Sequence, residues 1–101
     1  MKVEFLEPAR AEFVEAVEYY NGQREGLGLE FSDEIRATIQ RIIRYPEAWP
    51  LISKSTRRCR ASRFPYGVIY QVRGKMLLII GVMHLHREPR SWKTRVPQPR
   101  R

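Results

Sequence analysis

Residues 76–83 read Met-Leu-Leu-Ile-Ile-Gly-Val-Met and contain no charged or strongly polar side chain. A strand with one face in water alternates apolar and polar residues, whereas a strand covered on both faces is apolar throughout. This stretch therefore predicts the interior strand of a sheet. Even when it is extended to Leu85, it reaches only about half the length of a membrane-spanning helix, so no membrane span is expected.

Two further strands are predicted immediately before this stretch. Residues 57–63 and residues 68–73 alternate between two kinds of side chain, as strands with one buried face do. Residues 73–75, Arg-Gly-Lys, form a tight hairpin signal that joins the second of these strands to the interior strand. Tyr70 falls among the apolar positions, so we expect it to pack in the core rather than to bind a partner.

The first half of the chain predicts a short strand followed by a helical hairpin. Residues 2–6 alternate as a strand, and apolar residues recur at helical spacing over residues 9–20 until residues 21–22, Asn-Gly, end the first helix. A second helix is expected over residues 28–44, before Pro46 stops it. The acidic side chains of the first helix are expected to point to solvent: Glu12, Glu15 and Glu18.

These elements together predict an α+β fold with the order β-α-α-β-β-β, in which a small antiparallel sheet packs against an N-terminal helical hairpin. A chain of 101 residues has room for one core of ordinary size, so residues 1–95 are expected to form a single domain. Residues 96–101 contain two prolines and two terminal arginines, and they are expected to be a basic, disordered tail.

The charge is divided unevenly between the two halves. The chain has a formal net charge of +8, but residues 1–50 hold 6 basic and 10 acidic side chains, whereas residues 51–101 hold 13 basic side chains and one acid. A field of this sign attracts nucleic acid, an anionic membrane face or an acidic protein segment, and charge alone does not choose among them. The single cysteine, Cys59, excludes a disulfide framework and the N-terminus lacks a secretory pattern, so a cytoplasmic protein is expected.

The strongest candidate for a binding surface is the set of basic residues around the predicted strands. Alternate residues of a strand share a face, so Arg58 and Arg60 are expected on one face and Arg57 and Arg63 on the other. A second interpretation is a solvated edge strand, because positive charges on an edge prevent strands of different molecules from pairing. The set comprises Lys54, Arg57, Arg58, Arg60, Arg63, Arg87, Arg90, Lys93 and Arg95.

Two histidines close the interior strand. His84 and His86 are two positions apart and face the same way, which suits a hydrogen bond at the sheet end, ligand binding or acid–base chemistry. A metal site needs three or four ligands, and Cys59 is the one thiol of the sequence, so no metal and no other cofactor is expected. Tyr66 and Trp92, with arginines nearby, are candidates for stacking against unpaired bases.

Five local strings follow one another through the predicted elements. They are Phe13 to Tyr20 ending in two tyrosines, Gly28 to Phe31, Ile42 to Pro50 (IIRYPEAWP), Arg63-Phe64-Pro65-Tyr66 leading into Val68-Ile69-Tyr70, and His84-Leu85-His86-Arg87 followed by Pro89, Trp92 and Arg95. In their joint spacing over residues 2–95 they resemble the ParE/RelE superfamily of bacterial type II toxin–antitoxin toxins, which serve in plasmid stabilisation. The Phe-Pro-Tyr strand entry and the His-x-x-Arg-x-Pro-x-x-Trp ending resemble the ParE branch more than the RelE branch.

The resemblance implies a function. ParE-like toxins inhibit DNA gyrase by stabilising its cleaved DNA complex, have no established catalytic residues, and are neutralised by an antitoxin whose acidic or amphipathic C-terminal segment wraps the toxin. We therefore expect a gyrase inhibitor that forms a toxin–antitoxin hetero-oligomer. The residues expected to contact the target or the antitoxin are Arg58, Arg60, Arg63, Tyr66, His86, Arg87, Trp92 and Arg95.

Two alternatives stay open. RelE-like toxins cut messenger RNA in the ribosome, and in that branch the residue after the strand-entry tyrosine is usually arginine, where this chain has Gly67. If the chain is instead a metal-independent endoribonuclease, Arg63, His84 and Arg87 are the candidates for acid–base and phosphate-stabilising roles. The other alternative is a non-toxic nucleic-acid-binding module, whose affinity for naked nucleic acid falls steeply with salt.

Overall fold

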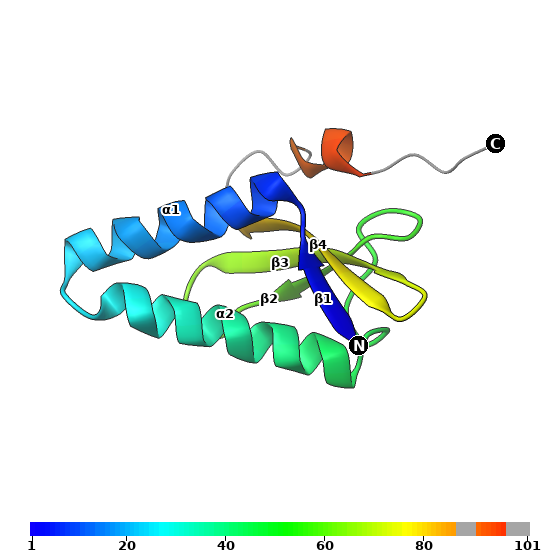
Figure 1. The fold of residues 1–101 in the computed structure, drawn as a ribbon, viewed down its shortest axis with the longest axis horizontal. Coiled ribbons are helices and arrows are strands. Elements are labelled where there is room, and N and C mark those ends of the chain that lie inside the picture. Colours follow the sequence, from blue (N-terminus) through cyan, green and yellow to red (C-terminus); the bar gives the residue numbers. More distant parts are fainter. Residues whose placement is uncertain (87–90, 97–101) are drawn as a thin grey trace.

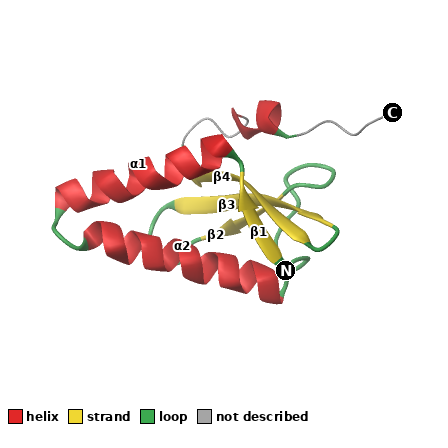
Figure 2. Cartoon of the chain, viewed as in Figure 1, coloured by secondary structure: helices red, strands yellow, loops and turns green. Residues whose placement is uncertain are grey.

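The computed structural model describes residues 1–86 and 91–96. Within them two helices lie against a four-stranded sheet, and a short 3-10 helix, η1, comes last (Figure 1 and Figure 2). The elements are β1 (Lys2–Phe5), α1 (Glu7–Gln23), α2 (Leu27–Arg44), β2 (Arg57–Arg60), β3 (Tyr66–Arg73), β4 (Met76–His84) and η1 (Ser91–Arg95). This order confirms the predicted α+β arrangement.

The strands form one sheet in the order β1-β4-β3-β2, so β4 is an interior strand, as residues 76–83 predict. β2 pairs with β3, and β3 with β4, in antiparallel fashion, but β1 pairs with β4 in parallel, with Phe5 opposite Ile79. The sheet is therefore mixed rather than wholly antiparallel, which corrects the predicted pairing at β1. Parallel neighbours need a long crossover, and the two helices together with β2 and β3 supply it.

The turn between the helices differs slightly from the prediction. α1 has Pro8 in its first turn, where a proline loses no helical hydrogen bond, and it continues to Gln23 instead of ending at the Asn-Gly pair. Asn21 does not end the helix. Its Oδ1 instead accepts a hydrogen bond of 3.0 Å from the backbone N–H of Gly26, in the turn between the helices. Gly26 has a φ of +87°, a left-handed conformation that suits glycine, and α2 starts at the following residue.

The two helices approach each other closely at a glycine. A Cβ on Gly28 would lie 2.5 Å from the carbonyl oxygen of Val17 and 3.0 Å from Cβ of Asn21, so this approach requires a residue without a side chain. The hairpin covers one face of the sheet, with α1 along β4 and α2 against β2 and β3.

Buried side chains fill both faces of the sheet. Leu77 and Ile79 of β4 pack on the helical side, whereas Leu78 and Ile80 pack on the other side, where Trp92 of η1 covers them. This two-sided burial explains why the strand is apolar along its length. Among the described residues, neither helix combines the length and the hydropathy needed to span a bilayer.

The register between β3 and β4 shifts once. Ile69 lies opposite Gly81 and Tyr70 lies opposite Ile79, so Ile80 is an extra residue without a direct partner on β3. A bulge of this kind disrupts the ladder locally and changes which neighbour the backbone groups face. Backbone groups around Ile80 are therefore left for bonds to side chains.

Candidate functional site

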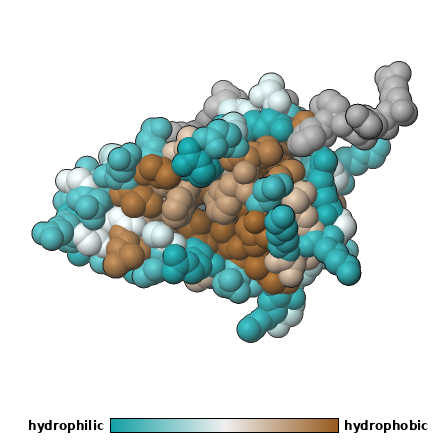
Figure 3. Space-filling model, viewed as in Figure 1, coloured by the Kyte–Doolittle hydropathy of each residue, from teal (hydrophilic) through white to brown (hydrophobic). Residues whose placement is uncertain are grey.

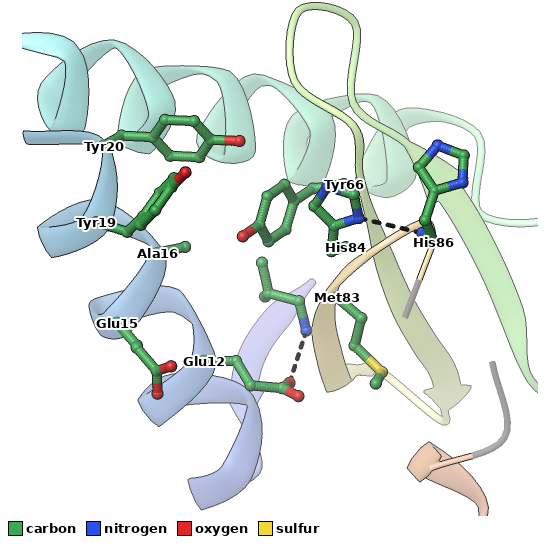
Figure 4. Close-up of a pocket in the computed structure, with 10 residues that line it drawn as sticks. Glu12, Glu15, Ala16, Tyr19, Tyr20, Tyr66, Met83, His84 and His86 are labelled. Atoms are coloured by element: carbon green, nitrogen blue, oxygen red, sulfur yellow. Dashed lines mark hydrogen bonds between the residues drawn. The ribbon is translucent and has the colours of Figure 1, made fainter. Parts of the chain in front are cut away.

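A groove with a volume of about 490 Å³ lies between α1 and the last residues of β4 (Figure 4). Its polar lining is made of tyrosine, histidine and glutamate side chains, and Ala16 is among its apolar lining residues. No lysine or arginine of the described residues lines it. The polar side chains of the lining are Glu12, Glu15, Tyr19, Tyr20, Tyr66, His84 and His86.

Three tyrosines form the aromatic side of the groove. Tyr66 is buried, with its ring centroid 6.0 Å from that of Tyr20 and 5.3 Å from that of His84. Tyr19 is 59% exposed and meets the Tyr20 ring edge-on at 5.2 Å. Burial, followed by the neighbouring Tyr66 and Tyr19 hydroxyls, raises the pKa of Tyr20 above its ordinary value. Tyr20 is therefore a neutral hydrogen-bonding group at physiological pH and not a base.

The two histidines are joined by a local hydrogen bond at the end of the sheet. His84 ends β4 opposite Tyr66, and the backbone N–H of His86 donates to Nδ1 of His84 at 3.1 Å. The two rings lie 5.4 Å apart. Because Nδ1 of His84 accepts a hydrogen bond, the neutral ring carries its proton on Nε2. In residues 1–86 and 91–96 no group of three or more side chains is arranged to hold a metal ion.

Glu12 does not point to solvent, so this part of the prediction for the first helix is wrong. Its Oε1 accepts a hydrogen bond of 3.1 Å from the backbone N–H of Val82, and its two oxygens accept bonds of 2.8 Å each from Nη1 and Nη2 of Arg95. Nη1 of Arg95 also donates to the carbonyl oxygen of Ile80 at 3.3 Å. The physical reason is that Glu12 lies one turn before the buried Ala16, on the side of α1 that faces β4.

Arg63 is held by α2. Its Nη2 donates to Oε1 of Glu30 at 2.7 Å, while Arg24 donates to the other oxygen at 2.9 Å, so one carboxylate binds two guanidinium groups. These hydrogen bonds, that of Arg63 first, lower the pKa of Glu30 below its ordinary value. The Arg63 guanidinium also lies 5.6 Å from the ring centroid of Phe64. Arg63 therefore stabilises the contact between the loop before β3 and the helical hairpin.

Arg57 and the pair Arg58 and Arg60 lie on opposite faces of β2, as predicted, but β2 ends at Arg60, so Arg63 lies in the following loop and not on a strand over residues 57–63. Arg57 donates hydrogen bonds of 3.2 and 2.7 Å to two backbone carbonyl oxygens of the loop 45–56. The stem of Arg58 passes over Gly67, where an added Cβ would lie 3.0 Å from Cγ and Cδ of the arginine. Arg60 shares the face of Arg58 and is exposed. Arg58 and Arg60 together form a basic surface on an edge strand of the sheet.

The structure places the predicted stacking residues in the two cores. Trp92 is 4% exposed and packs on the face of the sheet away from the helices, and Tyr66 is 7% exposed and packs on the helical side. Tyr70 is fully buried, and its hydroxyl donates to the carbonyl oxygen of Pro46 at 2.7 Å. The prediction that Tyr70 belongs to the core is therefore confirmed.

Some predicted residues lie outside the described part of the chain. Arg87 and Arg90 fall there, as do residues 97–101, for which a disordered tail stays a prediction. Val96, the first residue of the predicted tail, packs against the cluster around Trp92.

The groove itself was not predicted from the sequence as a site. Its walls come from α1, the start of β3 and the end of β4, which the sequence separates widely. One signal was available, because Tyr19 and Tyr20 are consecutive on a helix and two consecutive side chains cannot both face the same core.

The comparisons with known proteins agree with this architecture. The model of a family described as "ParE toxin of type II toxin-antitoxin system, parDE" matches residues 3–89. A solved structure described as the chromosomal ParDE toxin–antitoxin system from P. aeruginosa shares the fold, with a TM-score of 0.73 and 16% sequence identity over 83% of this chain and 95% of that chain. Among curated proteins the comparison found no match. The family match spans the helical hairpin, the sheet from residue 3 onward and the groove between them, so the chain belongs to the ParE toxin family of type II toxin–antitoxin systems.

Proposed function

We propose that this ParE-family chain inhibits DNA gyrase in the cytoplasm and is neutralised by a cognate antitoxin in a toxin–antitoxin hetero-oligomer. Membership of the family supplies the toxin class. The observation that carries the choice of target is the lining of the groove at the end of β4, which contains two carboxylates and no lysine or arginine among the described residues.

This lining is unfavourable for cutting RNA. Attack by a ribose 2′-hydroxyl develops negative charge on the phosphorus centre, and enzymes stabilise that charge with cations or preorganised donors. Glu15 of the groove is exposed and opposes a phosphate, whereas the charge of Glu12 is balanced by Arg95. Among the described arginines, Arg63 is paired with Glu30 of α2, and Arg95 is paired with Glu12 of the groove lining. These pairings support a protein that binds its target rather than a nuclease.

The antitoxin is expected to use the basic surface of β2. Arg58 and Arg60 lie on one face of an edge strand, where acidic side chains of a partner segment can form charge-assisted hydrogen bonds. The backbone of this edge is already engaged in part, because the N–H of Arg58 donates to the carbonyl oxygen of Pro50 at 3.1 Å and the carbonyl oxygen of Arg60 accepts from Arg41 at 3.2 Å, so the contacts are expected from the arginine side chains. An acidic segment that is disordered alone can order on this surface through such charge-assisted contacts.

A ribosome-dependent endoribonuclease is the second candidate. The observation that favours it is the pair of imidazoles 5.4 Å apart beside Tyr66, since histidines at this distance suit general acid–base catalysis. Catalysis would then depend on His84 together with Arg63 and Arg87.

The test is a gyrase cleavage assay with the purified chain, supercoiled DNA and purified gyrase. The proposal expects accumulation of linear, protein-linked DNA, and expects induced expression in a bacterial host to arrest growth with a DNA-damage response and intact messenger RNA. Cleaved messenger RNA with no effect on gyrase would favour the second candidate. Salt-sensitive binding to naked oligonucleotides without growth arrest would point to a non-toxic nucleic-acid-binding module.

Charge reversal separates the binding surface from general effects of charge. Arg58→Glu with Arg60→Glu is expected to weaken antitoxin binding or toxicity. Arg36→Glu with Arg44→Glu, two exposed residues of α2, changes the net charge by the same amount and is the matched control, expected to change neither. Unchanged toxicity and unchanged antitoxin affinity in the β2 variant would remove these two arginines from the proposal.

A further inference from the structure

β1 leaves one edge of the sheet open. On its inner side the N–H groups of Lys2 and Leu6 donate, at 3.0 and 2.9 Å, to carbonyl groups of the segment 75–79. Successive residues of a strand direct their backbone groups to opposite sides, so those of Val3 and Phe5 point away from β4. In Figure 1, β1 lies at the front of the molecule with no other described element drawn across it.

Apolar surface lies beside this edge. The side chains of Val3, Phe5 and Phe13 are only partly buried against the core on the helical side. Figure 3 shows a hydrophobic area over the region where β1 lies between α1 and α2. An open strand edge next to apolar surface favours pairing with another chain.

The charges of β1 are complementary to those of a second β1 strand. Lys2 and Glu4 lie on the same face of the strand, both are exposed, and neither forms an ion pair within residues 1–86 and 91–96. If two β1 strands pair in antiparallel fashion with Val3 opposite Val3, Lys2 of each copy faces Glu4 of the other. The dimer then contains two cross-strand pairs of opposite charge, related by the two-fold axis.

The same charges exclude the neighbouring register. Only residues with outward-pointing backbone groups can exchange hydrogen bonds with another strand, so the next possible register sets Val3 opposite Phe5. That register sets Glu4 opposite Glu4, which is destabilising. Among the registers that the backbone permits, the one with Val3 opposite Val3 is therefore the one that sets Lys2 opposite Glu4.

We propose that β1 is an interface between two copies of this chain, which pair through their β1 strands into one continuous sheet with Val3 at the two-fold axis. The partner is a second copy because, in one register, the charges of β1 are complementary to those of another β1 strand. This proposal is independent of gyrase inhibition, since it concerns the toxin chain by itself.

The experiment is sedimentation velocity on the purified full chain with its native N-terminus and any tag at the C-terminus. The wild type is expected to show a concentration-dependent dimer. Lys2→Glu or Glu4→Lys alone is expected to raise the dimer dissociation constant about tenfold or more, because each replaces two attractive pairs with two repulsive ones. The double variant Lys2→Glu with Glu4→Lys restores both pairs and is expected to dimerise like the wild type.

Two controls keep the outcome clear. Glu25→Lys changes the net charge as much as Glu4→Lys but lies in the exposed turn between the helices, and it is expected to leave the dimer intact. Far-UV circular dichroism of each variant shows that the fold is kept. A wild type that stays monomeric, or a double variant that is no better than the single ones, overturns the proposal. A monomer in which Val3→Pro abolishes antitoxin binding would assign the edge to the antitoxin instead.

Discussion

Glu12 on α1 and Arg95 on η1 form a two-pronged ion pair, with 2.8 Å at each prong, across 83 positions of sequence. Only 24% of the glutamate side chain and 18% of the arginine side chain are exposed, so water screens the pair weakly. The pair fastens the C-terminal segment, with the buried Trp92, to the first helix.

Replacing Glu12 by Gln is expected to lower the free energy of unfolding by about 1–3 kcal/mol, because the variant leaves Arg95 partly buried without its counter-charge. Urea unfolding followed by Trp fluorescence measures the change. Glu15→Gln, one turn away and exposed, is the matched control and should leave stability within about 0.5 kcal/mol of the wild type. Equal stabilities of the two variants would contradict a structural role for the ion pair.

Gly28→Ala is expected to destabilise the protein by about 1–3 kcal/mol, because the added methyl group would press against the carbonyl oxygen of Val17 and force the helices apart. Gly22→Ala is the matched control on the other helix, since a Cβ there meets nothing within 4 Å. Alanine in that helical position is expected to stabilise by roughly 0.5 kcal/mol. Thermal or urea unfolding of both variants tests the contrast, and changes of the same sign would show that helix packing is not tight at Gly28.

Glu30 gives the stability a defined dependence on pH. Its pKa in the folded state is lowered by hydrogen bonds from Arg63 and Arg24, so it stabilises the fold above its unfolded value, near 4.5, and loses this contribution as the pH falls through the folded value. The stability advantage of the wild type over Glu30→Gln is therefore expected to be full at neutral pH and to shrink on acidification. Urea midpoints of both proteins over a series of pH values measure it. A difference that does not vary with pH would contradict the assignment.

Cys59 is expected to react slowly with thiol reagents in the folded protein. Its side chain is 1% exposed, and burial raises the pKa of the thiol, although the nearby Arg41 acts in the opposite direction. Both the access and the thiolate fraction are therefore low. Labelling with a chromogenic disulfide is expected to accelerate strongly in denaturing urea. Equally fast labelling with and without urea would show that β2 opens readily.

The fold was largely predictable because its main features follow from patterns within short, continuous segments of sequence. Burial on both sides makes residues 76–83 apolar throughout, and helical spacing marks both helices. The parallel pairing of β1 was not predictable, since the order of strands in a sheet depends on which distant segments meet. Periodicity describes one strand at a time and carries no information on its neighbour.

The candidate site was also predictable only in its local features. The bond between His84 and His86 is local and follows from their spacing. Glu15 and Glu18 are exposed as predicted, whereas Glu12 is not, because helical spacing gives the face of a residue but not the distant residue that meets it. A groove built from three separate segments leaves no continuous pattern in the sequence.

The ion pair of Glu12 and Arg95 has one more consequence for the sheet. β1 ends opposite Ile79, and just beyond this point the Ile80 carbonyl oxygen accepts from Arg95 while the Val82 N–H donates to Glu12. One donor and one acceptor, spaced along a strand edge, are what the N–H and C=O groups of one further residue of β1 would offer. Two side chains from opposite ends of the chain thus form the hydrogen bonds that strand backbone would otherwise form. This part of the β4 edge is satisfied without a longer first strand.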